Sequence, residues 1–110
     1  MSYIEEFPGF ELDVIIPSGF KDCSWNKEPC PSWGKELEDG GVIRLIIDYP
    51  IASYRDYPGN SRFHCQYWMD GENDEMPLAV VHSDNWNHIL NWIKFMEIWG
   101  GWFCRRSLSV

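Results

Sequence analysis

The stretch that decides the fold is NWNHILNWIKFMEIW, residues 85–99. Its apolar residues recur every three or four positions, a period typical of a helix with one face in a core. Ser83 or Asp84 would cap its start, and Gly100 with Gly101 would end it. The sequence therefore predicts an amphipathic helix from about Asn85 to Trp99. Its core-facing stripe consists of Trp86, Ile89, Leu90, Ile93 and Met96.

A second apolar stripe on the same helix adds Trp92, Phe95 and Trp99. The two stripes merge into an apolar arc about 220° wide if each residue turns the helix by about 100°. A helix that lies on one sheet needs an arc of only about 100° or somewhat more. Two explanations are open. Either long loops that carry Trp25 and Trp33 wrap the helix, or the second stripe meets another chain.

Four further segments have the composition of β-strands, being rich in alternating or β-branched residues between turn signals. The last two should pair as an antiparallel hairpin, because their connection is too short for a crossover. We therefore expect an α+β fold, a small antiparallel sheet of three to four strands with one C-terminal amphipathic helix packed on one face. The predicted strands are Phe10–Ile16, Val42–Tyr49, Arg62–Met69 and Leu78–His82, and the second suits a central position.

Residues 20–40 show no clean period. Pro29 and Pro31 exclude a regular helix there and argue against a central strand. We expect a long loop that Trp25, Cys30 and Trp33 anchor to the body of the protein. A loop of this length is uncommon in compact domains and is often functional. The other interpretation is that its tryptophans cover an edge or a face of the sheet.

The chain has 110 residues, a length at which we expect one domain over residues 1–110. Its net charge of −8 disfavours direct binding to nucleic acid and favours a basic protein partner. The N-terminus has no basic region followed by an apolar one, as a secretory signal would. No apolar run is long enough to span a bilayer. We therefore expect a cytoplasmic protein that does not associate with membranes.

The residues that could carry chemistry form no known motif. The cysteines include no CxxC pair, the usual beginning of a zinc site, and nothing matches a nucleotide-binding loop or a nucleophile elbow. The sequence leaves open a metal site from Cys23, Cys30 and one histidine. It also leaves open a Cys65–His82 pair, if the third and fourth strands are neighbours. We expect no catalytic residues, no metal and no cofactor.

These features predict a non-enzymatic protein-binding module. The leading hypothesis is an inhibitor or an immunity-type protein, such as those of phages, that docks on a basic surface of a larger protein such as a nucleic-acid enzyme. Large aromatic side chains dominate interface energetics, and carboxylates steer the approach. The predicted partner-binding residues are Trp25, Trp33, Asp70, Glu72, Asp74, Glu75, Trp92, Phe95 and Trp99.

Two alternatives belong to other classes. One is a homodimeric structural domain in which the aromatic helix face pairs with itself. The other is a small Cys/His metal-binding protein or enzyme built on Cys23 and Cys30. Further acidic residues would add to a negative face, at Glu36, Glu38 and Asp39 and at Glu5, Glu6, Glu11 and Asp13.

Overall fold

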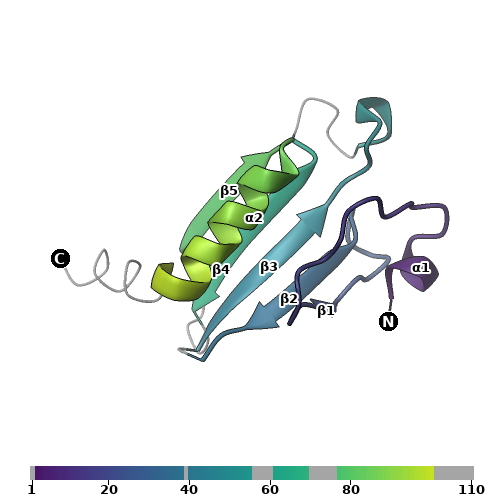
Figure 1. Ribbon diagram of the computed structural model, residues 1–110. Coiled ribbons are helices and arrows are strands. Elements are labelled where there is room, and N and C mark those ends of the chain that lie inside the picture. Colours follow the sequence, from purple (N-terminus) through teal and green to yellow (C-terminus); the bar gives the residue numbers. More distant parts are fainter. Residues whose placement is uncertain (1, 39, 56–60, 70–76, 101–110) are drawn as a thin grey trace.

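The computed structural model describes residues 2–38, 40–55, 61–69 and 77–100 of the chain. Within these ranges, five strands form one antiparallel sheet in sequence order, and a helix near the C-terminus lies on one face (Figure 1). The predicted α+β class is confirmed, but the sheet has five strands rather than three to four. The strands are β1 (Lys21–Asp22), β2 (Ser32–Glu36), β3 (Gly41–Ile47), β4 (Phe63–Met69) and β5 (Ala79–Ser83). The helices are α1 (Tyr3–Glu6), a 3-10 turn η1 (Ala52–Tyr54), α2 (Trp86–Phe95) and a π-helical turn η2 (Met96–Gly100).

β3 is the central strand, paired with β2 on one side and with β4 on the other. Side chains alternate along β3 and β4 between a fully buried row and a partly exposed one, as a sheet with one covered face requires. The predicted central position of this segment is confirmed, and so is the antiparallel pairing of the last two strands. The buried row consists of Ile43, Leu45, Ile47, Phe63, Cys65 and Tyr67, each at most 2% exposed.

The start of α2 is fixed by Asn85. Its side-chain oxygen accepts hydrogen bonds from two backbone N–H groups of the first turn, at 2.9 and 3.4 Å, which satisfies donors that a helix start leaves without a partner. The predicted cap at Ser83 or Asp84 is therefore wrong. Ser83 Oγ accepts from the Asn85 N–H at 2.9 Å, and Asp84 Oδ1 accepts from the Arg62 N–H at 2.7 Å. These two side chains therefore accept from backbone N–H groups outside α2, not from those of its first turn.

The two apolar stripes of the helix differ in how far their side chains are buried. In the first, Ile89, Ile93 and Met96 are at most 3% exposed, which confirms their core-facing role. Trp86 packs against the core, and Leu90 is partly buried. In the second, Trp92 packs against the core, whereas Phe95 and Trp99 are 46% and 53% exposed. After Phe95 the helix continues as the π turn η2, which holds more residues per turn than an α-helix. Its side chains are therefore rotated away from the phase that a regular α-helix would give.

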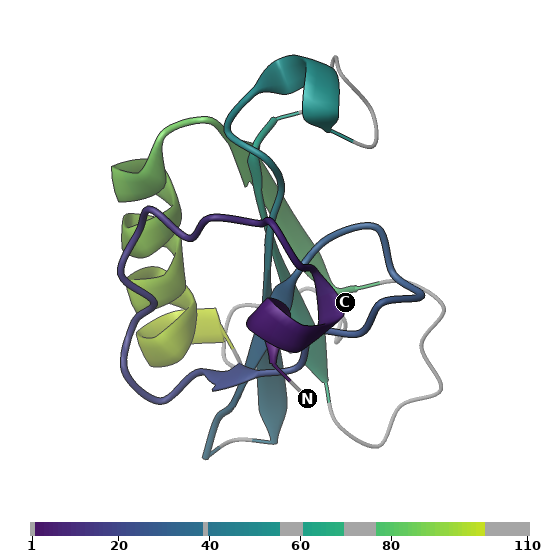
Figure 2. The same cartoon turned by 90° about the vertical axis from the view of Figure 1, so that its right-hand side faces the viewer.

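The predicted strand Phe10–Ile16 is wrong, because these residues form no strand. Their alternation nevertheless separates a core side from a solvent side. The segment lies on the same side of the sheet as α2, as the edge-on view shows (Figure 2). An extended chain that packs by its side chains has the same period as a strand, so the pattern alone could not distinguish the two. Phe10 is buried, Leu12, Val14 and Ile16 pack against the core, and Glu11, Asp13 and Ile15 are exposed.

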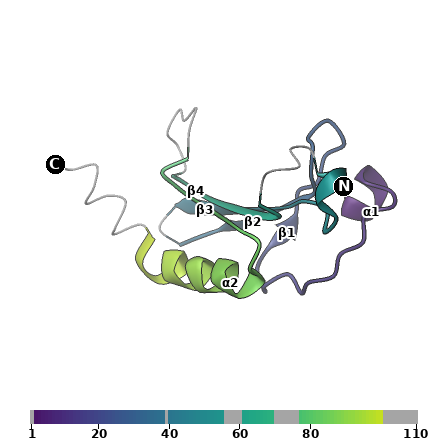
Figure 3. The ribbon, with the colours of Figure 1, turned by 90° about the horizontal axis from the view of Figure 1, so that it is seen from above.

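The prediction of a loop throughout residues 20–40 is also wrong, since this region contains β1 and β2. β2 begins directly after Pro31 and pairs with β3 over five residues. The prolines precede the strand and therefore remove no hydrogen bond from the ladder. Trp33 lies in β2 and is 4% exposed. The loop between β1 and β2 lies on the face of the sheet opposite α2 (Figure 3), so it does not wrap the helix.

Gly41 begins β3 where the buried ring of Tyr67 crosses the backbone. A Cβ at this position would lie 2.4 Å from the Tyr67 hydroxyl oxygen and 2.7 Å from Cζ. We expect Gly41→Ala to lower the free energy of unfolding by about 1–3 kcal/mol, the usual cost of overpacking, in urea denaturation. Gly34→Ala is the matched control, because its Cβ would make only ordinary contact, at 3.4 Å, with Cys23 Sγ. Equal losses in the two variants would contradict this explanation.

Asp13 fastens the segment of residues 10–16 to the start of β4. Arg62 is 8% exposed, and its guanidinium donates to the two Asp13 carboxylate oxygens at 3.1 and 2.5 Å. The Arg62 Nε–H donates to the Asp48 carbonyl oxygen at 3.1 Å. The hydrogen bonds from Arg62 hold the pKa of Asp13 below its ordinary value of 3.8.

Asp13→Asn leaves this largely buried cation without its counter-ion. We expect the variant to lose about 1 kcal/mol of unfolding free energy at neutral pH. A carboxyl group with a lowered pKa contributes stability above its unfolded pKa and loses it as the pH falls through the folded one. The difference from wild type should therefore shrink below about pH 4. Urea denaturation across this range measures it, and a difference that does not depend on pH would refute the ion pair as its cause.

Candidate functional site

The turn between β2 and β3 and the end of the C-terminal helix enclose a groove of about 520 Å³. We call it the hairpin groove. Two parts of the chain that are far apart in sequence build it, since Lys35 and Glu97 are separated by 62 positions. The lining residues are Lys35, Glu36, Leu37, Glu38, Glu97 and Ile98.

Backbone pairing holds the strand side of the groove in place. β1 is short, and its pairs with β2 are with Trp33 and Gly34, so the last two residues of β2 extend beyond its end. The following turn is closed by a hydrogen bond from the Leu37 N–H to the Gly41 carbonyl oxygen at 2.7 Å. Gly40, with φ of 89°, supplies the left-handed conformation that this turn needs. The turn therefore presents Glu38 from a fixed backbone.

The helix side of the groove is joined to β2 by an ion pair between Lys35 and Glu97. Lys35 alternates with Gly34 along β2, and its side chain leaves the sheet on the side of α2. The two side chains are 24% and 28% exposed, so water and salt weaken the attraction between them. The pair fixes the position of η2 over the end of β2.

The chemical character of the groove is acidic and partly aliphatic. Its lining includes three carboxylates, of Glu36, Glu38 and Glu97, and one ammonium group, of Lys35, which pairs with Glu97. Ile98 is 69% exposed at the edge of the groove. A Lys or Arg side chain of a partner matches this combination, because its stem is aliphatic and its head is cationic.

Two large aromatic side chains stand next to the groove on the same helix. Trp99 follows Ile98 directly, and Phe95 precedes Ile98 by three residues, a spacing that makes neighbours on a helix surface. Each of the three is at least 46% exposed. The end of the helix therefore presents exposed apolar side chains beside a groove whose lining includes three carboxylates.

Of the predicted partner-binding residues that the structure describes, Phe95 and Trp99 are the two that it brings together on exposed surface. Trp33 is in the core and has almost no surface to offer a partner, and Trp92 is partly buried. Trp25 is 45% exposed, but it belongs to the loop between β1 and β2 on the opposite face, where the Lys27 ammonium lies 5.7 Å from its ring centroid. The predicted acidic residues Asp70, Glu72, Asp74 and Glu75 lie outside the described residues.

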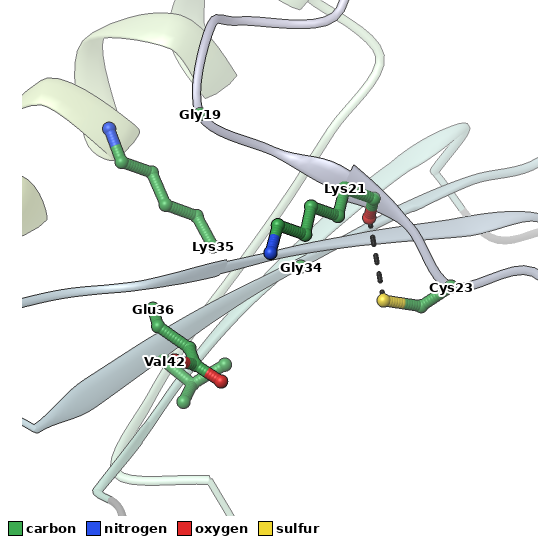
Figure 4. Close-up of a pocket in the computed structure, with 7 residues that line it drawn as sticks. All are labelled: Gly19, Lys21, Cys23, Gly34, Lys35, Glu36 and Val42. Carbon is green, nitrogen blue, oxygen red and sulfur yellow. Dashed lines mark hydrogen bonds between the residues drawn. The ribbon is translucent and has the colours of Figure 1, made fainter.

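A second hollow, of about 310 Å³, lies around the end of β1 and shares Lys35 and Glu36 with the hairpin groove (Figure 4). Lys21 lies along Gly34, and the Cys23 thiol donates to the Lys21 carbonyl oxygen over 3.4 Å. The Lys35 side chain leaves in the direction of the helix end. Glu36 therefore stands where two hollows meet, within reach of a ligand in either.

The cysteine sites that the sequence left open are not assembled. Cys23 is exposed and Cys30 is buried, and in the described ranges no three His, Cys, Asp or Glu side chains are grouped to hold a metal ion. Cys65 pairs with Val81 and points to the core, whereas His82 points to the other face. The Cys65–His82 pair that the sequence left open is therefore not formed. Burial raises the pKa of Cys65 to about 12, which keeps it a thiol at neutral pH.

Two features of the surface escaped the sequence analysis. Ile98 lies outside both helical stripes, two positions after the buried Met96, so even a regular α-helix would turn it about 200° away from that residue. His64 and His82 face each other across β4 and β5, a juxtaposition that only the register reveals.

Comparison with known proteins adds no relative. No protein-family model, curated protein or solved structure matches the chain. In the part of the chain that the structure describes, no helix combines the length and the apolar character needed to cross a membrane.

Lys35→Met removes the ammonium group but keeps an apolar side chain of similar length. We expect the variant to lose about 0.2–1 kcal/mol of unfolding free energy, the range of partly exposed ion pairs. The loss should fall toward zero in about 1 M salt, where charges are screened within about 3 Å. Urea denaturation at low and high salt measures both effects. A Glu97→Gln change added to Lys35→Met should cost nothing further, and an additive loss would show that the two residues act separately.

Proposed function

We propose that this chain is a non-enzymatic protein-binding module, an inhibitor or immunity-type protein that docks on a basic surface of a larger protein such as a nucleic-acid enzyme. The observation that supports it best is the hairpin groove. Its lining includes three carboxylates and Ile98, and the exposed Phe95 and Trp99 lie at the same end of the helix.

This arrangement has the anatomy of a protein interface. Such interfaces have an apolar centre in which aromatic residues are enriched, surrounded by a polar rim. A few large side chains at the centre carry most of the binding energy. Here Phe95, Ile98 and Trp99 would supply the centre, and Glu36, Glu38 and Glu97 the rim.

The net charge of the whole protein indicates what kind of partner surface it would bind. A net charge of −8 attracts a positive surface over long range and accelerates encounter. Proteins that bind nucleic acid carry such surfaces, because they neutralise phosphates with Lys and Arg. An acidic module that occupies this surface would exclude the nucleic acid from it, which is the activity of an inhibitor.

Reversing one charge at the rim of the groove distinguishes attraction by the groove from attraction by the net charge of the whole protein. We expect Glu38→Lys to slow association with the partner at least several-fold, because a rim charge acts mainly on the association rate. Glu11→Lys is the matched control. It changes the net charge equally at another exposed position, in the segment of residues 10–16, and should leave most of the rate intact. The measurement is biolayer interferometry with a partner that co-purifies stoichiometrically from the native host.

Three outcomes would contradict the proposal. One is the recovery of no stoichiometric partner under native conditions. Another is equal slowing by Glu38→Lys and Glu11→Lys, which would show that the groove has no special part. The third is a homodimer in sedimentation that Ile98→Asp converts to monomers, because the helix end would then be covered by a second copy of the chain.

A further inference from the structure

A pair of histidines stands on the face of the sheet opposite α2. His64 of β4 and His82 of β5 are register partners, and both alternate with residues that point to α2. Their Nδ1 atoms are 2.6 Å apart, and their ring planes are nearly perpendicular, at 81°. His82 is exposed and His64 is partly exposed, so a small ion can reach the space between them.

The hydrogen bond of His64 to the main chain defines which of its nitrogens carries the proton. Its Nε2 lies 2.7 Å from the Ser61 carbonyl oxygen, and a carbonyl oxygen can only accept, so Nε2 must donate. In the neutral ring, Nδ1 then carries the lone pair. This Nδ1 is the atom that lies 2.6 Å from the His82 Nδ1.

We propose that His64 and His82 bind one divalent transition-metal ion of the Ni²⁺ or Cu²⁺ type through their two Nδ1 atoms. Metal–imidazole bonds are about 2.0–2.1 Å long. Two nitrogens 2.6 Å apart therefore subtend an angle of about 80° at the metal. This is close to the right angle between adjacent ligands of a tetragonal site, which Ni²⁺ and Cu²⁺ favour, and far from the tetrahedral angle of zinc.

The surroundings of the pair suit a metal ligand. A ligating histidine almost always donates its other ring N–H to a carbonyl or a carboxylate, which orients the ring, and Ser61 already provides this contact. Burial, together with the nearby His82 and Arg55, lowers the pKa of His64 from 6.5 against the opposing effects of the Ser61 carbonyl and Asp48. The net charge of −8 adds attraction for a cation.

A shared proton is the competing explanation of the short separation. A hydrogen bond from the His82 Nδ1–H to the His64 Nδ1 would also bring the two atoms close. Metal binding requires that this proton move to the His82 Nε2, so that both Nδ1 atoms offer lone pairs. The remaining coordination positions would hold water, because in the described ranges no third side chain completes the site.

Titration of the untagged full chain with Ni²⁺ tests the proposal. We expect isothermal calorimetry at about pH 7.5, above the ordinary histidine pKa, to show one equivalent bound. His64→Gln and His82→Gln should each weaken binding at least tenfold. His88→Gln is the matched control, because His88 is exposed in the first turn of α2, and it should bind as wild type does. Ni²⁺ should also raise the melting temperature of wild type and His88→Gln but not of His82→Gln.

A second measurement uses the wild-type protein and therefore leaves β4 unchanged. In the wild-type protein, Ni²⁺ should protect His64 and His82, but not His88, from acylation by diethyl pyrocarbonate. The proposal is overturned if wild type and His82→Gln bind Ni²⁺ equally, if neither binds it, or if all three histidines react equally with and without the metal. The last two results would leave only a shared proton between the rings. The site is at the end of the sheet where α2 begins and the hairpin groove is where α2 ends, so neither result bears on the proposed function.

Discussion

The fold depends on one apolar layer, the contact between the buried row of β3 and β4 and the inner stripe of α2. Ile43, Leu45, Ile89 and Ile93 are at most 1% exposed in it, and each buried side chain of this kind contributes about 1.5–3 kcal/mol. α2 covers only part of that face, and the extended segment of residues 10–16 covers the part beside it. The α2 side of the sheet is therefore covered. The opposite side carries the loop between β1 and β2 and leaves His64 and His82 at least partly exposed.

The register of β4 determines which of its side chains face the core and which lie on the side of the sheet opposite α2. A slip of one residue between strands would move every side chain of a strand to the opposite face. The register that buries Cys65 therefore also places His64 on the opposite face, where its register partner is His82 of β5. The histidine pair is thus held by the apolar layer beneath it, although neither ring belongs to that layer.

The sequence predicted those elements whose pattern has one structural solution. β3 is rich in β-branched residues and lies between turn signals, and β4 and β5 are joined by a short connection. The apolar residues of α2 recur every three or four positions. The sequence-based prediction failed where one sequence pattern is compatible with two different structures. Phe10–Ile16 alternates as a strand does, yet it packs by side chains alone, and β2 follows prolines whose position outside the ladder only the structure reveals. The helix cap also moved, from Ser83 or Asp84 to Asn85, because all three residue types favour that position.

The candidate sites depend on contacts that no local pattern records. Glu36 and Glu38 stand out as acidic residues in the sequence, but their relation to Glu97 and Ile98 arises only because β2 ends beneath the last turn of the helix. The end of the helix is also where its inner stripe ends. Met96 is buried, whereas Ile98 and Trp99, which lie outside that stripe, are 69% and 53% exposed. The last turn therefore packs through Met96 and presents apolar side chains beside carboxylates on its outer side.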